Sequence, residues 1–121
     1  MLAEEELSYK VRGAIYEVYN QLGFGYLEKI YERALSHELK ACSIDVQCQV
    51  PLSVRYKDIV VGEYFVDVIV EKRILLELKA QPRISRADEA QLLNYLTASG
   101  LRVGMLVNFT YPKAQIRRLV R

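Results

Sequence analysis

The spacing of apolar residues divides the chain into segments with helical periodicity and segments with strand periodicity. From Glu5 to Leu22 apolar residues recur every three or four positions, which predicts an amphipathic helix. Gly23 is expected to end this helix. A second helix is predicted to begin near Tyr26, with Tyr31 in its apolar stripe. Two helices therefore open the chain.

The period changes in the middle of the chain. The stretch "IDVQCQVPLSVRYKDIVVGEYFVDVIVEKRILLELKA" is rich in Val, Ile and Tyr and has polar breaks at Lys57-Asp58 and at residues 71–73. This pattern predicts three strands in an antiparallel meander. Pro51 predicts an edge position or a bulge in the first strand.

A helix and at least one strand are predicted after the meander. Ser85 and Asp88 form a variant of the capping box at the start of the helix, and Gly100 ends it. The segment "RVGMLVNF" predicts a strand, and the tail "YPKAQIRRLVR" fits either a short helix or a last strand. The order of elements predicts an α/β fold with a mixed sheet.

Composition narrows the class of protein. A chain of 121 residues fits a single domain over residues 1–121. Seventeen Lys and Arg against fifteen Asp and Glu leave a net charge of +2, which excludes a dense basic coat for nucleic-acid binding. Any contact with nucleic acid must therefore be local.

The cysteines and the N-terminus indicate a cellular compartment. Cys42 and Cys48 lack CxxC spacing and have only His37 as a further soft ligand, so we expect reduced thiols rather than a zinc site. The start "MLAEEELSYK" is acidic, unlike a signal peptide, and no apolar run reaches the roughly 18 residues of a membrane span. We expect a cytoplasmic protein that does not bind membranes.

Two charges interrupt the apolar run "ILLELKA" at the end of the meander. Strand alternation predicts the following faces on the last two strands. One face of the second strand carries Val66, Val68 and Val70, and the other carries Phe65, Asp67 and Ile69. One face of the third strand carries Ile74, Leu76, Leu78 and Ala80, and the other carries Leu75, Glu77 and Lys79.

The predicted register brings two acids together. If residues 71–73 form the turn, pairing is symmetric about Lys72 and Asp67 lies opposite Glu77, with Cβ atoms about 4.5–5.5 Å apart. Because the like charges repel, we expect a positive group between them. Lys79 and a divalent cation such as Mg²⁺ are the two candidates. A solvated surface pair is the alternative, although Asp is depleted in strands.

Three further polar residues fall on helix faces near these acids. Glu28 lies within roughly 60° of Tyr31 on a helical wheel and is predicted to point inward, where it needs a cation, a donor or a water-filled cleft. The alternative is a Glu that reaches solvent at the helix N-terminus. Gln91 and Tyr95 share a helix face and either orient a ligand or complete the rim of a core.

The acids and the lysine have the spacing of a known signature. Asp67, nine residues, and then Glu77-Leu78-Lys79 resemble the D-x(n)-(D/E)-x-K pattern of the PD-(D/E)XK nuclease superfamily, the restriction-endonuclease-like fold. This resemblance implies a mixed sheet flanked by helices, with an antiparallel three-strand meander and at least one further strand. It also implies hydrolysis of phosphodiester bonds in DNA with Mg²⁺ or Mn²⁺.

A second motif gives a narrower resemblance. In "GYLEKIY", Gly25, Glu28 and Tyr31 are similar to the motif that names the GxxExxY proteins, a prokaryotic family assigned to the same superfamily. The resemblance continues through "LSVRYK", "ELKA", "EAQLLNYL" and "VNF" and so covers nearly the whole chain.

The resemblance implies a role for each residue of the site. The metal ligands would be Glu28, Asp67, Glu77 and the backbone carbonyl of Leu78. The catalytic residues would be Asp67, Glu77, Lys79 and Gln91, and Gln91 with Tyr95 is similar to the Q-x-x-x-Y element of related exonucleases. Substrate contacts are expected from Tyr31, Tyr95, Arg83 and Arg86, with further phosphate contacts from Lys113, Arg117 and Arg118.

Several positions depart from the family pattern. Val66 replaces a proline, Phe65 stands where a basic residue is expected, and Tyr19 and Asp88 stand where histidines are expected. An inactive nucleic-acid-binding or protein-interaction module on the same fold is therefore one alternative. A homodimer formed through a strand edge or the Tyr-rich surface is another, since the chain has nine tyrosines.

Overall fold

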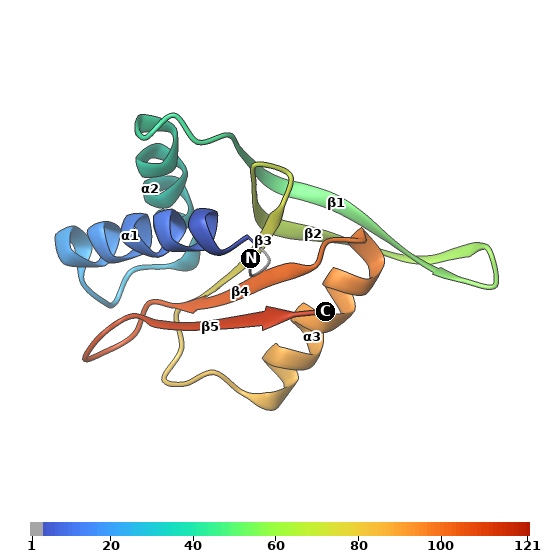
Figure 1. Ribbon diagram of the computed structural model, residues 1–121. Coiled ribbons are helices and arrows are strands. Elements are labelled where there is room, and N and C mark those ends of the chain that lie inside the picture. The colour runs from blue at the N-terminus through green and yellow to red at the C-terminus, as the bar shows by residue number, and fades with distance from the viewer. Residues whose placement is uncertain (1–3) are drawn as a thin grey trace.

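The computed structural model describes residues 4–121, so Met1, Leu2 and Ala3 of the acidic N-terminal segment lie outside the described residues. Its helices are α1 (Glu5–Leu22), α2 (Glu28–Ala41) and α3 (Arg86–Ser99). Its strands are β1 (Val46–Tyr56), β2 (Ile59–Val70), β3 (Ile74–Lys79), β4 (Val103–Asn108) and β5 (Gln115–Val120). Figure 1 shows their arrangement.

The helix ends follow local chemistry. α1 ends at Gly23, whose φ of 70° is readily reached without a side chain. α2 begins at Glu28 rather than near Tyr26, because the backbone stays extended at Leu27. At α3 the Ser85–Asp88 capping box forms as predicted, and Gly100 closes the helix in the left-handed conformation.

The five strands form one mixed sheet in the order β1-β2-β3-β4-β5. β3 and β4 are parallel and are joined through α3, whereas the other neighbours are antiparallel. The predicted meander is confirmed, and the tail forms strand β5 rather than a helix. Pro51 lies on edge strand β1, whose register with β2 shifts between Val54 and Arg55 because Val61 of β2 has no partner there.

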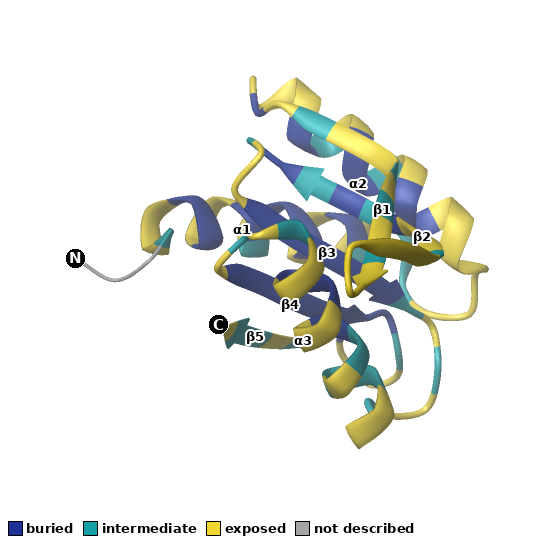
Figure 2. Cartoon of the chain, turned by 90° about the vertical axis from the view of Figure 1, so that its right-hand side faces the viewer, coloured by how far each residue is buried: buried dark blue, intermediate teal, exposed yellow. Residues whose placement is uncertain are grey.

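Helices cover both faces of the sheet. One core cluster joins α1 and α2 to the sheet, and a second joins α3 to the opposite face. β3 and β4 are buried along most of their length in Figure 2. A Cβ at Gly104 would lie 2.9 Å from a Leu92 methyl carbon, so the bare glycine lets α3 approach β4 closely. No helix within residues 4–121 is long and apolar enough to cross a bilayer.

The register of β2 with β3 is the predicted one. Val70 pairs with Ile74 and Val68 with Leu76, which is symmetric about Lys72. One predicted face is wrong, because Val66 packs in the α3 cluster while Val68 packs with α1 and α2. The alternation changes at Asp67, opposite which the β1 backbone adopts a positive φ of 52° at Gln49.

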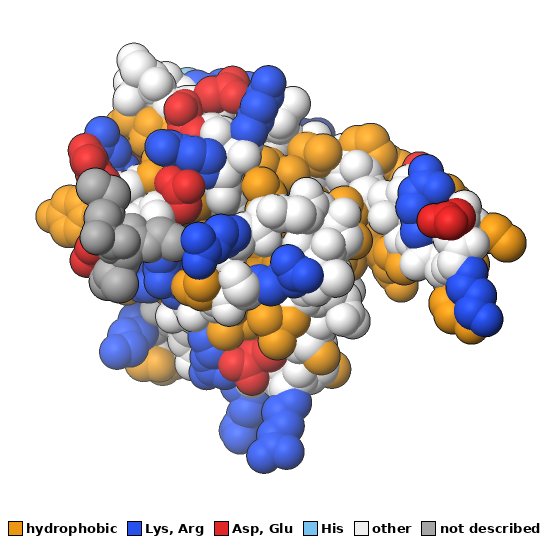
Figure 3. Space-filling model, turned by 45° about the vertical axis from the view of Figure 1, so that its right-hand side comes forward, with side chains coloured by type: hydrophobic (Ala, Val, Ile, Leu, Met, Phe, Trp, Pro, Cys, Tyr) orange, Lys and Arg blue, Asp and Glu red, His pale blue; other side chains and the backbone are white. Residues whose placement is uncertain are grey.

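The hairpin of β1 and β2 extends beyond the rest of the sheet. Its far part stands away from the body of the molecule in Figures 1 and 3. It carries exposed apolar side chains, namely Tyr56, Ile59, Val60 and Val61. We call residues 54–63 the arm.

Candidate active site

The site lies where β2 and β3 stop pairing. After the Val68–Leu76 pair, backbone N–H groups donate to carboxylates instead of to the neighbouring strand. The Asp67 N–H donates to Glu77 Oε1 at 3.1 Å, and the Leu78 N–H donates to Asp67 Oδ2 at 2.8 Å. Asp67 and Glu77 thus come together as predicted. The N–H groups of Asp67 and Leu78 supply partial positive charge beside the two carboxylates.

Burial and mutual repulsion disfavour the charged forms of both acids. Burial, and next the charge of Asp67, raise the pKa of Glu77 to about 8, although the Asp67 N–H and Lys79 oppose this rise. Burial also raises the pKa of Asp67, against the hydrogen bonds from Leu78 and Gln49. Glu77 therefore holds a proton at neutral pH when no cation is bound.

Lys79 is the positive side chain of the cluster. Its Nζ lies 3.4 Å from Gln91 Oε1 and 3.8 Å from Asp88 Oδ1, so two side chains of α3 hold it. Its charge lowers the pKa of Asp67, of Glu77 and of Glu28. Lys79 is half-buried beside the acids, at the position the sequence predicted.

Glu28 is at the edge of the site rather than inside it. Glu28 is exposed as the first residue of α2, so it is not buried, but it faces the acids as predicted, because it lines a pocket together with Asp67 and Leu78. Partial burial nevertheless raises its pKa, with Asp67 adding to the rise and Lys79 opposing it. Glu28 is therefore close enough to sense both residues.

The two predicted residues of α3 also reach this region. Gln91 contacts Lys79, whereas Tyr95 is buried and its ring centroid lies 5.3 Å from that of Tyr64. Burial, and next the charge of Glu77, raise the pKa of Tyr95 to about 12. Tyr95 therefore stays protonated, and as a buried residue it has little surface left for a substrate.

Two polar residues near Asp67 were not predicted from the sequence. Gln49 Nε2 donates to Glu32 Oε1 at 2.6 Å and lies 3.4 Å from Asp67 Oδ1. Glu32 is buried and pairs with Lys29 at 3.2 Å. Glu32 follows Glu28 by four positions, so the two share a helix face, and this spacing could have indicated that Glu32 lies near the site. Gln49 comes opposite Asp67 only because the bulge at Val61 of β2 shifts the register by one residue.

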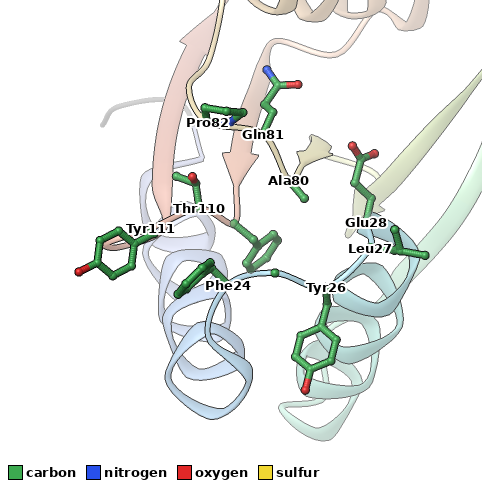
Figure 4. A pocket seen from close by; sticks show the side chains of 11 residues that line it. Phe24, Tyr26, Leu27, Glu28, Ala80, Gln81, Pro82, Thr110 and Tyr111 are labelled. Carbon is green, nitrogen blue, oxygen red and sulfur yellow. The ribbon is translucent and has the colours of Figure 1, made fainter.

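Two pockets meet at Glu28. The first, here called the carboxylate pocket, has a volume of about 300 Å³ and is lined by Glu28, Lys29, Glu32, Gln49, Asp67 and Leu78. The second, here called the aromatic pocket, has a volume of about 670 Å³ and is shown in Figure 4. It is lined by residues 24–28, 80–82 and 109–111.

The donor set near Asp67 suits a hard divalent cation. Carboxylate and carbonyl oxygens are the ligands that Mg²⁺ and Mn²⁺ prefer, and acids with raised pKa values gain from a nearby positive charge. Within residues 4–121 no three His, Cys, Asp or Glu side chains are already arranged to hold a metal ion. The ligand type therefore fits, although each acid already accepts a hydrogen bond from a backbone N–H group.

The remaining predicted residues are scattered. Tyr31 is fully buried, stacks on Phe109 at 4.2 Å and donates to the Gly23 carbonyl at 2.6 Å, so it supports the loop before α2. Arg83 and Arg86 are exposed around the start of α3. Two other predicted phosphate contacts have partners within the protein, since Arg117 pairs with Glu89 at 3.0 Å and Arg118 donates to Ser8 at 3.4 Å.

The positions that depart from the family pattern have structural partners. The Tyr19 hydroxyl donates to the Thr110 carbonyl at 2.7 Å, which ties α1 to the loop after β4. Asp88 caps α3 and approaches Lys79. Phe65 is exposed on β2. Tyr19 and Asp88 therefore stabilise the loops that surround the site.

Comparisons with known proteins agree with this fold. A sequence profile of the PD-(D/E)XK nuclease superfamily matches residues 5–119. The crystal structure of SSO0001 is similar in fold, with a TM-score of 0.58 and 19% identity over 77% of this chain. The matched part covers 49% of SSO0001, so the chain spans about half the length of that protein. None of the curated proteins matches the sequence.

Proposed function

Because the chain belongs to the PD-(D/E)XK nuclease superfamily, we propose that it is a metal-dependent nuclease that hydrolyses phosphodiester bonds in DNA. The fold is restriction-endonuclease-like, with a five-strand mixed sheet flanked by helices. The observation that carries the proposal is the group of Asp67, Glu77 and Lys79 at the point where β2 and β3 part. In this proposal residues 1–121 act as one nuclease domain.

The residues at the point where β2 and β3 part would hold the cation. Asp67 and Glu77 would supply carboxylate oxygens and Leu78 its carbonyl, with Glu28 joining directly or through water. When bound, Mg²⁺ or Mn²⁺ would polarise the scissile phosphate and lower the pKa of a water molecule. Glu77 would release its proton on binding, because its pKa of about 8 belongs to the cation-free state.

Lys79 and Gln91 would handle the reacting groups. Lys79 carries a positive charge beside the acids and would orient the attacking water and offset the negative charge that develops on the phosphate. Gln91 contacts Lys79 and Asp88 pairs with it, so both would fix the direction of the ammonium group. Arg83 and Arg86 would contact flanking phosphates, as exposed basic residues before and at the start of α3.

We also propose that the chain is one of the GxxExxY proteins. Gly25 has a φ of 106°, and Glu28 lies at the junction of both pockets. Tyr31 supports the intervening loop by its bond to the Gly23 carbonyl. The three residues of the motif would thus serve one purpose, which is to present Glu28 to the carboxylates.

The test is cleavage of labelled DNA. Wild-type protein with Mg²⁺ or Mn²⁺ should cut plasmid, linear duplex or single-stranded DNA, and EDTA should stop the reaction. Asp67→Asn should be inactive, whereas Asp58→Asn at the tip of the arm should cut normally. Equal cutting by both variants would mean that a contaminant is responsible, and no cutting by any preparation would favour the inactive-module alternative.

The arm supports a second proposal, a homodimer. Ile59, Val60 and Val61 are each about half exposed or more on a projecting hairpin, where a second copy would cover them. Sedimentation equilibrium should then show a dimer that Val61→Asp dissociates. A monomeric wild type would remove this proposal. We also infer a cytoplasmic location, since Cys42 and Cys48 are both free.

A further inference from the structure

The aromatic pocket is formed by three loops that the sheet brings together. Residues 24–28 come from the loop between α1 and α2 and from the start of α2, residues 80–82 follow β3, and residues 109–111 follow β4. Figure 4 shows these loops around one hollow. Its volume of about 670 Å³ is in the range of small-molecule sites.

Two aromatic side chains that line this pocket are largely exposed to solvent. Phe24 is 57% exposed and Tyr111 is 69% exposed, and their rings meet edge to face at 5.1 Å. Beneath them Phe109 and Tyr31 are buried and stacked, so the core already has its aromatic pair. Because exposed rings bury little surface, Phe24 and Tyr111 contribute little to stability and are available for a ligand.

The aromatic pocket borders the proposed cation site at Glu28. Glu28 lines both pockets, and Ala80 directly follows Lys79 in the sequence. A nucleotide whose phosphate lies at Asp67 and Lys79 would therefore have its own or a neighbouring base close to Phe24 and Tyr111.

The surroundings of the aromatic pocket suit a nucleotide better than an apolar ligand. Exposed Arg83 follows the pocket residue Pro82 by one position, and exposed Lys113 follows Tyr111 by two. Basic residues beside exposed aromatic rings are the combination used by proteins that bind single strands, with charges for the phosphates and rings for the bases.

We propose that the aromatic pocket binds an unpaired nucleobase of a single-stranded segment, which stacks on one ring of the edge-to-face pair Phe24 and Tyr111 and contacts the other with its edge. A base inside a duplex has both faces covered by its neighbours, so it cannot stack on these rings. This inference rests on the proposed function, because the phosphate at the carboxylates places the base. It adds that the substrate is a single strand or an unpaired end.

The test is DNA binding without cleavage. With Mn²⁺ present to hold the phosphate at the carboxylates, and with nuclease-resistant phosphorothioate linkages in the DNA, fluorescence anisotropy would measure the affinity of the full chain for a labelled single-stranded oligonucleotide and for the same sequence as a blunt duplex. The wild type should prefer the single strand. Phe24→Ala/Tyr111→Ala should bind the single strand about tenfold more weakly, as expected for the loss of one stacking contact.

Controls separate stacking from general effects. Tyr9 on α1 is 78% exposed and lies outside the aromatic pocket, so Tyr9→Ala should bind like the wild type. Thermal melts should show that all three proteins are folded. A terminal 2-aminopurine in the oligonucleotide should lose fluorescence on binding the wild type and lose less on binding the double variant.

The outcomes distinguish the pocket from the nuclease. If the double variant binds as tightly as Tyr9→Ala, or if no protein binds single-stranded DNA, the pocket proposal is overturned whether or not the wild type cuts DNA. If the double variant binds weakly while the wild type fails to cut with Mn²⁺, the nucleobase pocket is supported and the nuclease proposal fails.

Discussion

The two ends of the β2–β3 pair use their backbone groups differently. From Val70–Ile74 to Val68–Leu76 the strands pair with each other, and the side chains between them are apolar and mostly buried. One pair further along, the backbone N–H groups of Asp67 and Leu78 donate to carboxylates instead.

The difference shows how a small sheet can hold acids in its interior. Where pairing ends, backbone donors become available, and a carboxylate that accepts from them is partly compensated for its burial. Compensation is incomplete, because the pKa values of Asp67 and Glu77 are still raised. We therefore expect the paired end to determine stability and the open end to determine cation binding.

The largest expected effect concerns the paired end. Leu76 is fully buried in the α1–α2 cluster, so Leu76→Ala should lower the free energy of unfolding by about 2–5 kcal/mol. Urea unfolding measures this loss. The affinity of the folded variant for Mn²⁺ should remain that of the wild type, and a coupled loss of affinity would show that the two ends are not independent.

The next effect concerns catalysis at the open end. Lys79→Ala should reduce the rate of DNA cleavage by roughly 10²- to 10³-fold, because it removes the charge that offsets the developing negative charge on the phosphate. Cation affinity should not fall, since Lys79 repels a cation. Lys10→Ala on α1 is the control. Cleavage rates within a factor of two of each other for these variants would exclude Lys79 from the mechanism.

The pH dependence of stability should come from Glu77 at the open end of the β2–β3 pair, since the paired end is apolar. In EDTA, folded Glu77 keeps its proton up to a pKa of about 8, while in the unfolded chain the glutamate loses its proton above its ordinary pKa of 4.5. The contribution of Glu77 to the free energy of unfolding should therefore be highest below pH 4.5. It should fall as the pH rises towards 8, by up to about 1.4 kcal/mol per pH unit.

Glu77→Gln removes this titration. Its free energy of unfolding, measured in urea at pH 5, 6.5 and 8, should fall less steeply with pH than that of the wild type. Parallel curves for the two proteins would show that Glu77 is ionised in the folded state.

The smallest expected effect concerns the edge of the site. Glu28 is exposed, so it should contribute less to cation binding than the two acids on the strands. Glu28→Gln should weaken Mn²⁺ binding by about tenfold in calorimetry, as for a ligand that acts directly or through water. Glu63→Gln on the arm is the matched control, and equal affinities would remove Glu28 from the ligand set.

Local patterns were sufficient to predict most of the fold. Spacing and caps gave the ends of α1 and α3, and the tight turn around Lys72 fixed the β2–β3 register. Short turns leave few pairings open, so Asp67 and Glu77 could be placed together without coordinates. The pairing of the tail as β5 depends on contacts across the sheet that no local pattern encodes.

The errors in the site come from backbone irregularities. The bulge at Val61 of β2 and the positive φ of Gln49 bring Gln49 to Asp67, and neither follows from alternation. The helical wheel gave the direction of Glu28 but not its exposure, because a wheel treats every turn alike. At the first turn of a helix, a side chain on the inner face can still reach solvent past the end of the packed core.

The central claim is that Asp67, Glu77 and the Leu78 carbonyl bind one divalent cation. Crystals soaked in MnCl₂ and measured for anomalous scattering test it most directly. The account predicts one strong manganese peak in contact with both carboxylates. A map with no peak there, or with manganese bound at other surface carboxylates alone, would contradict it.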